Sequence, residues 1–390
     1  MACARSAGHD RLKGFVISDC NQGRAVPMIL DIDSAAVNMK WSRRSFLRAA
    51  IIGACAVSPV AMAFTAPMQT PAMPSNLIAH SPLTDVVCAG NRLVTAGSRG
   101  NILYSDDRGL TWQQAQVPVS TDLVALAFPS DKQGWAVGHG GIVLHTEDGG
   151  QSWSKQLDGF AASKLAIDFY QANAQLLPVA GQYLEREQSL AVEGETQPFM
   201  DVFFLDERRG YVVGTFNRIF MTLDGGQHWK PLMHLTDNPQ ELHFYSIAGL
   251  DDQLYLAGEQ GKVWRHDLAS DRFISADTAY TGTLFGVLPT AANLLFAYGM
   301  RGTLLRSVDR GETWEKIPSP IQGGITTAVV LTDGRLLIAD QSGGVAMSVD
   351  GGRHFKTLSI VKPMPYAAAT ALSENSLVMV GALGARIATI

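Results

Sequence analysis

Five aspartates recur in one short pattern along the chain, Ser/Thr-x-Asp-x-Gly-x-x-Trp/Phe. A carboxylate in such a pattern could take part in catalysis, bind a metal ion or hold a tight turn by accepting hydrogen bonds from backbone N–H groups. Glycine would supply the positive-φ position of the turn, and burial of the aromatic residue would fix the returning strand. We therefore interpret the pattern as structural. The residues are Asp107 and Trp112, Asp148 and Trp153, Asp224 and Trp229, Asp309 and Trp314, and Asp350 and Phe355.

Other groups of reactive residues lack the spacing of an active site. The sequence contains no Gly-x-Ser-x-Gly, His-Glu-x-x-His or Cys-x-x-Cys motif, and no phosphate-binding glycine loop that opens a helix. Its histidines are scattered without the spacing of metal ligands. We predict that the protein is not an enzyme and that it uses no cofactor and no metal ion.

The pattern repeats with a period of about 41 residues, which indicates an array of similar units. Each unit has two apolar strands, a Gly-x-x-Gly-like turn and a third strand that leads into the Asp pattern. The predicted inner strands start near Thr84, Asp122, Met200, His243, Thr283, Ile325 and Ala367. The turns start at Gly97, Gly138, Gly214, Gly258, Gly299 and Gly381, with Asp340 in the sixth unit. A degenerate copy at Val263–Phe273 and an insertion at 159–196 explain the wider gaps.

Four short strands in each of seven units predict an all-β fold, a seven-bladed β-propeller over residues 64–390. The last unit, Tyr366–Ile390, is long enough for only three strands. We expect a strand near Asn76–His80 to complete that blade and close the ring, because an open sheet edge invites aggregation. Two β-sandwiches would be the alternative, but they would not explain one period kept through the chain.

The insertion between blades 2 and 3 carries a helical pattern. Leu165, Phe169, Ala172 and Leu176 recur at helical spacing before Pro178. A second helix is predicted from Tyr183 to Ala191. The apolar stripe would pack on the propeller rim, or it would form a lid over a bound client.

The N-terminal region has the composition of an export signal. Arg43-Arg44-Ser45-Phe46-Leu47 precedes an apolar stretch at 49–60, and Ala61-Met62-Ala63 offers small residues to a signal peptidase. The arginine pair resembles a twin-arginine signal. We predict a signal peptide at 39–63, a start site annotated too early so that 1–38 is not part of the mature protein, and a periplasmic location. Ile52-Gly53-Ala54-Cys55 is a weaker, lipoprotein-like alternative.

Export would leave the mature protein with one cysteine. Cys3, Cys20 and Cys55 precede the predicted cleavage site after Ala63, and only Cys88 follows it. No intramolecular disulfide can then form. Cys88 lies in the apolar run Val86–Ala89, and we expect it in the core.

The charge of the predicted mature chain argues against nucleic-acid binding. The formal net charge is -5, but residues 1–63 hold eight of the basic and four of the acidic residues. The remainder has 23 Lys and Arg against 32 Asp and Glu. An acidic protein is a poor ligand for phosphate backbones.

The repeats resemble the Asp-box, or BNR, repeats of sialidases, sortilin-type receptors and photosystem II assembly and stability factors. A sialidase would need an arginine triad, a Tyr/Glu nucleophile pair and a Phe/Tyr-Arg-Ile-Pro segment before the first repeat. Its nearest counterpart, Phe216–Phe220, lies in the third blade and lacks proline. A glycan-binding or glycan-cleaving propeller is therefore the alternative hypothesis.

Among these Asp-box families, the chain more closely resembles the photosystem II assembly factors, over roughly residues 75–390. The turns Gly97–Gly100, Gly138–Gly141 and Gly299–Gly302 carry this resemblance. It implies a non-enzymatic scaffold, a monomer, that binds a protein client such as a membrane protein or envelope complex under assembly. Nothing in the sequence shows that the host is photosynthetic. The resemblance implies client contacts at Arg99 and Arg301 within the turns, with Arg218 and Arg306 as nearby additions. In a four-stranded blade, the turn between the second and third strands lies on the same face as the link to the next blade. We therefore expect Arg99, Arg301, His139 and the insertion to share the partner-binding face.

Overall fold

The computed structural model describes residues 66–193, 197–360 and 363–390. The predicted signal peptide at 39–63, its alternative lipoprotein site and the segment 1–38 lie outside the described residues. The described residues belong to one compact unit, Phe64–Ile390.

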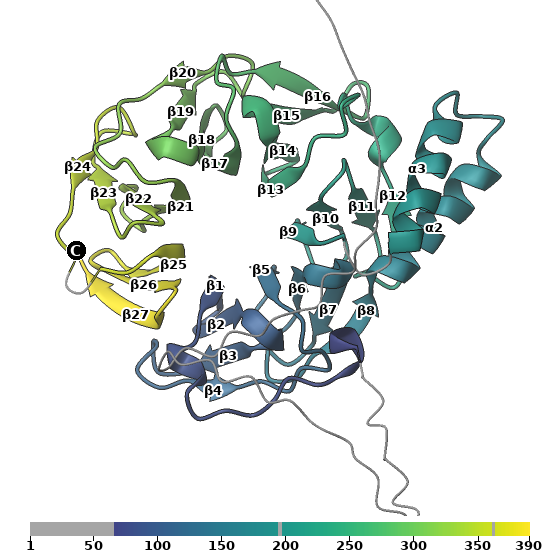
Figure 1. Ribbon diagram of the computed structural model, residues 1–390. Helices are drawn as coiled ribbons and strands as arrows, with labels where there is room; N and C mark the ends of the chain where they lie inside the picture. Colours follow the sequence, from purple (N-terminus) through teal and green to yellow (C-terminus); the bar gives the residue numbers. More distant parts are fainter. Residues whose placement is uncertain (1–65, 194–196, 361–362) are drawn as a thin grey trace, which may run out of the picture. The chain divides into compact units, whose positions relative to one another are not determined.

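The predicted seven-bladed propeller is confirmed. Seven antiparallel sheets stand in a ring (Figure 1), and each sheet runs outward from its innermost strand. Blade 1 contains β1 (Leu83–Ala89), β2 (Arg92–Gly97), β3 (Ile102–Ser105) and β4 (Gln113–Gln114), and blade 2 contains β5 (Leu123–Ala127), β6 (Gly134–Gly138), β7 (Ile142–Thr146) and β8 (Ser154–Leu157). Blade 3 contains β9 (Phe199–Phe204), β10 (Gly210–Gly214), β11 (Ile219–Thr222) and β12 (Lys230–Pro231).

The remaining blades follow the same order in the sequence. Blade 4 contains β13 (Phe244–Leu250), β14 (Gln253–Gly258), β15 (Lys262–Asp267) and β16 (Arg272–Asp277), and blade 5 contains β17 (Leu284–Ala291), β18 (Leu294–Gly299), β19 (Leu304–Ser307) and β20 (Glu315–Lys316). Blade 6 contains β21 (Ile325–Val330), β22 (Leu336–Asp340), β23 (Val345–Ser348) and β24 (Lys356–Thr357), and blade 7 contains β25 (Tyr366–Ser373), β26 (Ser376–Gly381) and β27 (Gly384–Thr389).

The second strand of each blade carries most of the core. Every residue of β6 and of β10 is buried. Their sequences are continuous apolar runs because neighbouring blades pack against both faces of each sheet. The outermost strands of four blades are only two residues long, and both residues of β20 are exposed. Apolar packing between neighbouring blades therefore stabilises the ring.

Each inner strand has a β-bulge near its first residue, where one residue is skipped in the pairing with the second strand. A bulge turns the side chain of the extra residue away from the regular register. The skipped residues are Thr84, Val124, Met200, Tyr245, Phe285, Thr326 and Ala367. The bulge position is therefore architectural, while its side chain differs from blade to blade.

The Asp patterns form closed hydrogen-bonded turns between the third and fourth strands. In blade 1 the Ser105 hydroxyl donates to Asp107 Oδ1 at 2.7 Å and accepts from the Gly109 N–H at 2.8 Å. Asp107 also accepts from the N–H and the hydroxyl of Thr111. The other four aspartates accept from the equivalent positions. The carboxylates therefore act as turn acceptors.

The blade 7 sheet has three strands, so the strand expected near Asn76–His80 is wrong. Residues Ile78–His80 form a turn of 3-10 helix (η2) that contacts β27. Ile78 is 6% exposed and packs with Leu83 and Val86 of blade 1 and with Val378 and Val380 of blade 7. A cluster of apolar side chains, which we call the seam, therefore closes the ring in place of an added strand.

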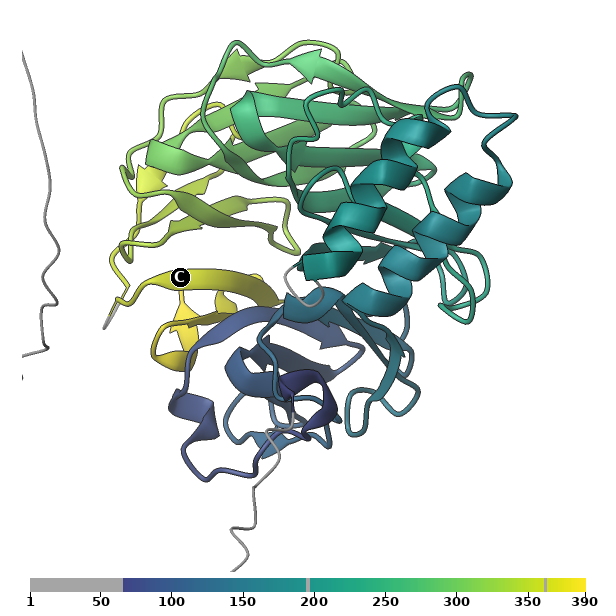
Figure 2. The same cartoon turned by 45° about the vertical axis from the view of Figure 1, so that its right-hand side comes forward.

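The insertion forms a helical hairpin of α2 (Gly159–Ala172) and α3 (Ala180–Glu193), seen as the teal pair in Figure 2. Asp158 caps α2 by accepting from the Ala161 N–H at 3.0 Å. The predicted stripe is partly wrong, because α2 ends before Leu176, which is 77% exposed. Its buried face is Ala162, Ala166 and Tyr170.

Two smaller features complete the description. Cys88 is exposed and free, so its expected core position is wrong. It lies on β1, and its Sγ is 3.6 Å from the Thr370 hydroxyl of blade 7. Among the described residues, no helix has the length and apolar character needed to cross a membrane.

Candidate partner-binding face

The strand order places two kinds of connection on one face of the ring, which we call the turn face. Leu83 at the start of β1 pairs with Gly97 at the end of β2. The link into each blade therefore lies beside the turn between its second and third strands. The helical hairpin lies on the same face, because Gly159 packs directly against Gly141 in the turn of blade 2. The Asp boxes lie at the opposite ends of the third strands.

The turns of blades 1 and 5 present the two arginines predicted to contact a client. Arg99 and Arg301 are exposed, and both have left-handed backbones, with φ 59° and 56°. The Arg99 N–H donates to Asp122 Oδ1 at 2.8 Å, which fixes the blade 1 turn to blade 2. Neither guanidinium forms an ion pair within the described part of the chain. Each therefore offers an unpaired positive charge to solvent, but they stand on non-adjacent blades.

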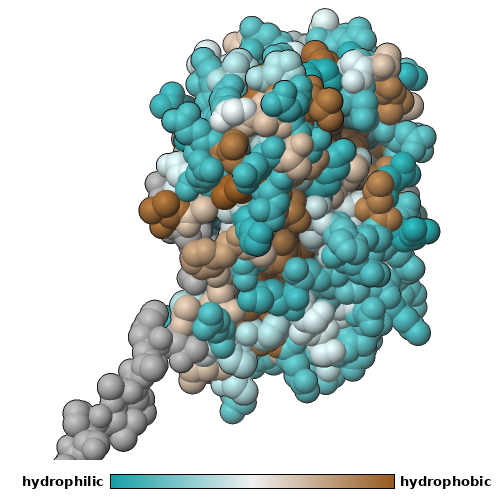
Figure 3. Space-filling view, turned by 90° about the vertical axis from the view of Figure 1, so that its right-hand side faces the viewer, coloured by the Kyte–Doolittle hydropathy of each residue, from teal (hydrophilic) through white to brown (hydrophobic). Residues whose placement is uncertain are grey.

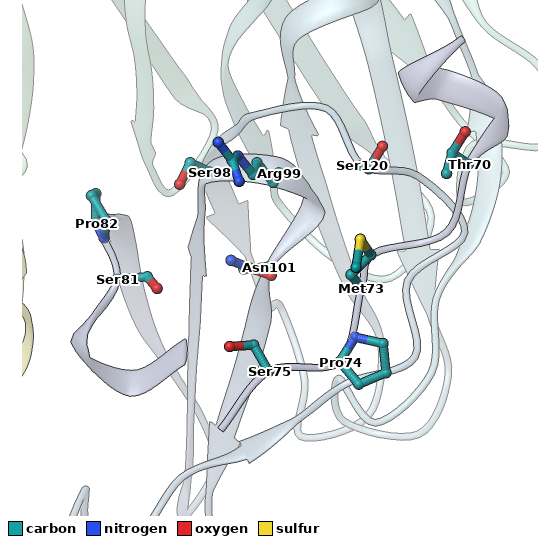
Figure 4. A pocket seen from close by; sticks show the side chains of 10 residues that line it. All are labelled: Thr70, Met73, Pro74, Ser75, Ser81, Pro82, Ser98, Arg99, Asn101 and Ser120. Carbon is teal, nitrogen blue, oxygen red and sulfur yellow. The ribbon is translucent and has the colours of Figure 1, made fainter. Parts of the chain in front are cut away.

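A cavity of about 810 Å³ adjoins Arg99 (Figure 4). The chain before blade 1 forms one wall through Thr70, Met73 and Ser75, and the blade 1 turn forms another through Ser98 and Arg99. Arg99 is the only charged residue in the lining, which otherwise offers hydroxyl, amide and apolar groups. The cavity therefore suits a neutral or negatively charged ligand group.

His139 is exposed in the corresponding turn of blade 2, η4 (His139–Gly141). The next residue, Gly140, has φ 76° and packs on the Met68 side chain so closely that a Cβ atom would overlap it. A side chain at residue 140 would require Met68 to move, although the same left-handed turn position holds Arg99 in blade 1 and Arg301 in blade 5. The histidine is therefore the single side chain that this turn can present beside Met68.

Two further predicted contact residues are corrected. Arg218 is 1% exposed, and its Nη2 lies 3.0 Å from Glu187 Oε2 of α3. Arg306 lies next to Ser307 of the Asp box, on β19, and pairs with Glu315 at 2.7 Å while its side chain is 12% exposed. The prediction is wrong for Arg218, because no partner can reach it. Arg306 does not lie in a turn of the turn face.

Arg218 instead anchors the hairpin to blade 3. Burial lowers its pKa, while Glu187 opposes that shift. Burial likewise raises the pKa of Glu187. Nη2 also donates to the Ser163 hydroxyl of α2 at 3.2 Å, so one guanidinium contacts both helices. The hairpin is therefore fixed to the ring by an interior ion pair, which favours rim packing over a mobile lid.

The sequence reasoning missed a row of rings on the turn face: Phe216, His243, Tyr245 and Phe285. All four are half-buried. Phe216 occupies the same turn position in blade 3 as Arg99 in blade 1, and Tyr245 and Phe285 are bulge residues. The turn and bulge positions were readable from the repeat, but the contacts between blades were not.

The hairpin side of the molecule is mainly hydrophilic, with apolar residues in separate patches (Figure 3). In the described part of the insertion, the large apolar side chains that are exposed are Phe160, Leu176, Val179 and Val192. Phe160 starts α2, and Leu176 and Val179 lie in the loop between the helices.

Two half-buried aspartates lie on inner strands. Asp85 of β1 accepts from the Leu126 N–H of blade 2 at 2.7 Å, and Asp201 of β9 accepts from the Ile247 N–H of blade 4 at 2.8 Å. Burial raises the pKa of Asp85 to about 6 and that of Asp201 to about 7, against the lowering effect of these N–H donors. They connect neighbouring blades. In the described ranges, no group of His, Cys, Asp or Glu side chains is placed to hold a metal ion.

Comparisons with known proteins give one consistent result. The model of the "Photosynthesis system II assembly factor YCF48" family matches residues 82–170 and 185–275. A photosystem II stability/assembly factor of Arabidopsis thaliana, HCF136, is 36% identical over 77 residues, which span 18% of this chain and 19% of the relative. The photosystem II assembly lipoprotein Ycf48 of Synechococcus is 22% identical over 278 residues, 67% of this chain and 70% of the relative.

Solved structures agree at the level of the fold. A structure of YCF48 bound to D1 peptide has a TM-score of 0.58 and 17% identity, and covers 82% of this chain and 99% of its own. YCF48 from Cyanidioschyzon merolae has a TM-score of 0.58 and 18% identity, and the match covers 81% of this chain and 97% of that structure. The WD40 propeller of Doa1 has a TM-score of 0.57 at 8% identity, and the match covers 82% of this chain and 96% of that structure. The fold alone therefore does not identify a function.

Proposed function

Because the predicted resemblance to the photosystem II assembly factor-like family is confirmed, we propose that this chain is a non-enzymatic assembly factor that binds a protein client. The observation that carries the proposal is the sequence match to Ycf48 along 67% of the chain. The structure of YCF48 bound to D1 peptide supports a peptide segment as the bound part of the client. The client is a membrane protein or envelope complex under assembly.

The turn face is the proposed binding face. Arg99 and Arg301 offer unpaired charges there, His139 is exposed in the turn of blade 2, and the cavity next to Arg99 can take a client side chain. The opposite face carries Asp-box turns, whose carboxylates are already satisfied by the chain's own donors. An assembly factor acts by holding a client, so no reacting group is needed. The glycan alternative has no support among the relatives and structures named above.

We place the mature protein in the periplasm as a monomer of residues 64–390. The lipoprotein description of the Synechococcus relative supports export. The arginine pair at 43–44 and the small residues at 61–63 support a twin-arginine signal at 39–63, with 1–38 outside the mature protein.

Affinity capture from detergent-solubilised envelopes tests the proposal. Tagged residues 64–390 would be compared with the double variant Arg99→Glu/Arg301→Glu by mass spectrometry. A matched control is Arg108→Glu/Arg310→Glu, which changes two exposed arginines with left-handed backbones in the same blades but on the Asp-box face. We expect a membrane protein to be retained by wild type and the control and lost by Arg99→Glu/Arg301→Glu. Equal retention by all three proteins would contradict the arginine contacts, and retention of no protein would contradict the assembly-factor role.

A further inference from the structure

Four ring side chains of blades 3, 4 and 5 form a continuous row on the turn face, which we call the aromatic strip: Phe216, His243, Tyr245 and Phe285. The ring centroids of Phe216 and His243 are 4.7 Å apart, those of His243 and Tyr245 6.4 Å, and those of Tyr245 and Phe285 6.3 Å. All four residues are half-buried, so each keeps part of its surface accessible.

Phe216 is held in an unfavourable backbone conformation. Its φ is 55°, and Asn217 follows with φ 60°. The left-handed backbone belongs to this turn position, because Arg99 in blade 1, Gly140 in blade 2 and Arg301 in blade 5 share it, with φ of 59°, 76° and 56°. The turn position therefore accepts glycine or arginine, and the fold does not require the aromatic ring of Phe216.

The bulge positions point the same way. In blades 1 and 6 the bulge residue is a threonine whose hydroxyl donates to the next blade: Thr84 to the Leu123 carbonyl at 2.7 Å, and Thr326 to the Tyr366 carbonyl at 2.8 Å. In blades 4 and 5 it is an aromatic residue, Tyr245 or Phe285, and these two contact each other. The fold therefore accepts threonine here, and the aromatic residues are particular to this part of the ring.

Charges beside the aromatic strip are paired within the chain. The Arg186 guanidinium of α3 lies over the Phe216 ring at 4.5 Å and pairs with Glu241 at 3.0 Å. The Nδ1 of His243 is 3.9 Å from a Glu259 oxygen, and its backbone N–H donates to that carboxylate at 2.9 Å. Because these charged groups already have partners within the chain, a highly charged ligand would gain little from them. The strip is therefore complementary to an uncharged, apolar ligand.

We infer that the aromatic strip is a second client contact, which binds an extended peptide segment with aromatic or aliphatic side chains. This inference rests on the proposed function, because it adds a contact for the same client. Neighbouring rings meet at 73°, 50° and 71°. Their edges and faces alternate along the row, which suits apolar side chains at successive positions of an extended segment. A sugar ring would require a flatter platform than these angles provide.

The test uses substitutions that the propeller already contains at equivalent positions. The triple variant Phe216→Gly/Tyr245→Thr/Phe285→Thr places in the strip the residue types of Gly140, Thr84 and Thr326. It removes three rings but introduces only residue types that the propeller already holds at these positions, so we expect the triple variant to fold. Phe160→Ala is the control, because Phe160 is a 50% exposed aromatic residue outside the strip.

A phage-displayed random 12-residue peptide library would be selected on wild-type residues 64–390. Selected peptides would be labelled with fluorescein and titrated by anisotropy. We expect peptides rich in aromatic and aliphatic residues whose affinity falls at least tenfold in the triple variant and changes less than twofold in Phe160→Ala. Sialyllactose and chitohexaose, added as competitors, are expected to leave binding unchanged.

The outcomes separate this inference from the proposed function. Peptides that bind the triple variant as well as wild type but lose affinity in Arg99→Glu/Arg301→Glu would overturn the strip and leave the client role intact. Displacement by either sugar would overturn the peptide class. Failure to select any peptide would count against both the strip and the client role.

Discussion

Single carboxylates in this protein fall into two classes with opposite responses to pH. The Thr111 and Thr313 hydroxyls donate to Asp107 and Asp309, and with the turn N–H groups they lower the pKa of each to about 2. Asp85 and Asp201 lie on inner strands, where burial raises the pKa to about 6 and about 7. The native structure therefore stabilises the ionised form of aspartate at an Asp box and the protonated form of aspartate on these inner strands.

We expect the free energy of unfolding to decrease on both sides of about pH 4. The Asp boxes bind fewer protons than unfolded aspartates, so their contribution is lost as pH falls from about 4 through about 2. Asp85 and Asp201 bind more protons than unfolded aspartates, so their contribution to the free energy of unfolding is lost as pH rises from about 4 through about 6 to about 7. Urea titrations at pH 2 to 8 measure both limbs. Stability that rises steadily from pH 4 to 7 would contradict the assignment to Asp85 and Asp201.

Residue roles followed from the sequence wherever they are local. The Asp-box turn involves residues within five positions of one another, so its hydrogen bonds could be anticipated from the pattern. The role of Arg218 could not, because Glu187 is 31 residues away in an insertion that interrupts the repeat. Arg218 and Arg99 look alike in the sequence, and only packing against the hairpin makes one buried and leaves the other exposed.

At the scale of elements, the hairpin shows why helical periodicity placed the insertion but not its contact surface. Small residues at 162 and 166 let α2 approach blade 3, and Tyr170 extends that face to a hydrogen bond with His234 Nδ1 at 3.2 Å. The larger Leu165 and Phe169 flank this face. A prediction from hydrophobicity alone places the larger residues on the buried face, whereas close packing against the propeller favours small residues there.

Removal of one partner of the buried ion pair is expected to be costly. Glu187→Gln keeps the shape of the side chain but leaves the Arg218 charge buried without a counter-charge, so we expect a loss of about 3–5 kcal/mol in the free energy of unfolding. Lys164→Gln, in a pair whose side chains are 75% and 60% exposed, should cost less than about 0.5 kcal/mol. Urea denaturation followed by tryptophan fluorescence compares them.

The double variant Glu187→Leu/Arg218→Met is the second measurement, because it removes both charges and restores apolar contact. Its stability should return to within about 1–2 kcal/mol of wild type. A Glu187→Gln variant as stable as Lys164→Gln would show that the ion pair does not anchor the hairpin.

At the scale of the whole molecule, the period predicted the number of blades but not the closure of the ring. The expected fourth strand of blade 7 followed from the rule that sheet edges are covered. Residues 78–80 form a 3-10 turn at that place instead, and Ile78 enters the seam. The repeat pattern could not reveal this, because the closing segment lies outside the repeat.

The seam predicts different effects for two neighbouring residues. Ile78→Ala removes a side chain that is 6% exposed, and we expect a loss of about 2 kcal/mol or more. Leu77→Ala changes a side chain that is 71% exposed and should alter stability by less than about 0.5 kcal/mol. Hydrogen exchange should also rise in β1 and β26 for Ile78→Ala. Equal effects of the two substitutions would show that the seam does not close the ring.

The seam also sets the timing of folding during synthesis. Residue 78 meets residues 378 and 380, so the two sides are separated by about three hundred residues of translation. At roughly 5–20 residues per second, blade 1 waits on the order of 15–60 seconds for its last neighbour to leave the ribosome. Throughout that interval the nascent propeller keeps an apolar flank uncovered, and a chaperone that shields this flank would protect the unfinished chain.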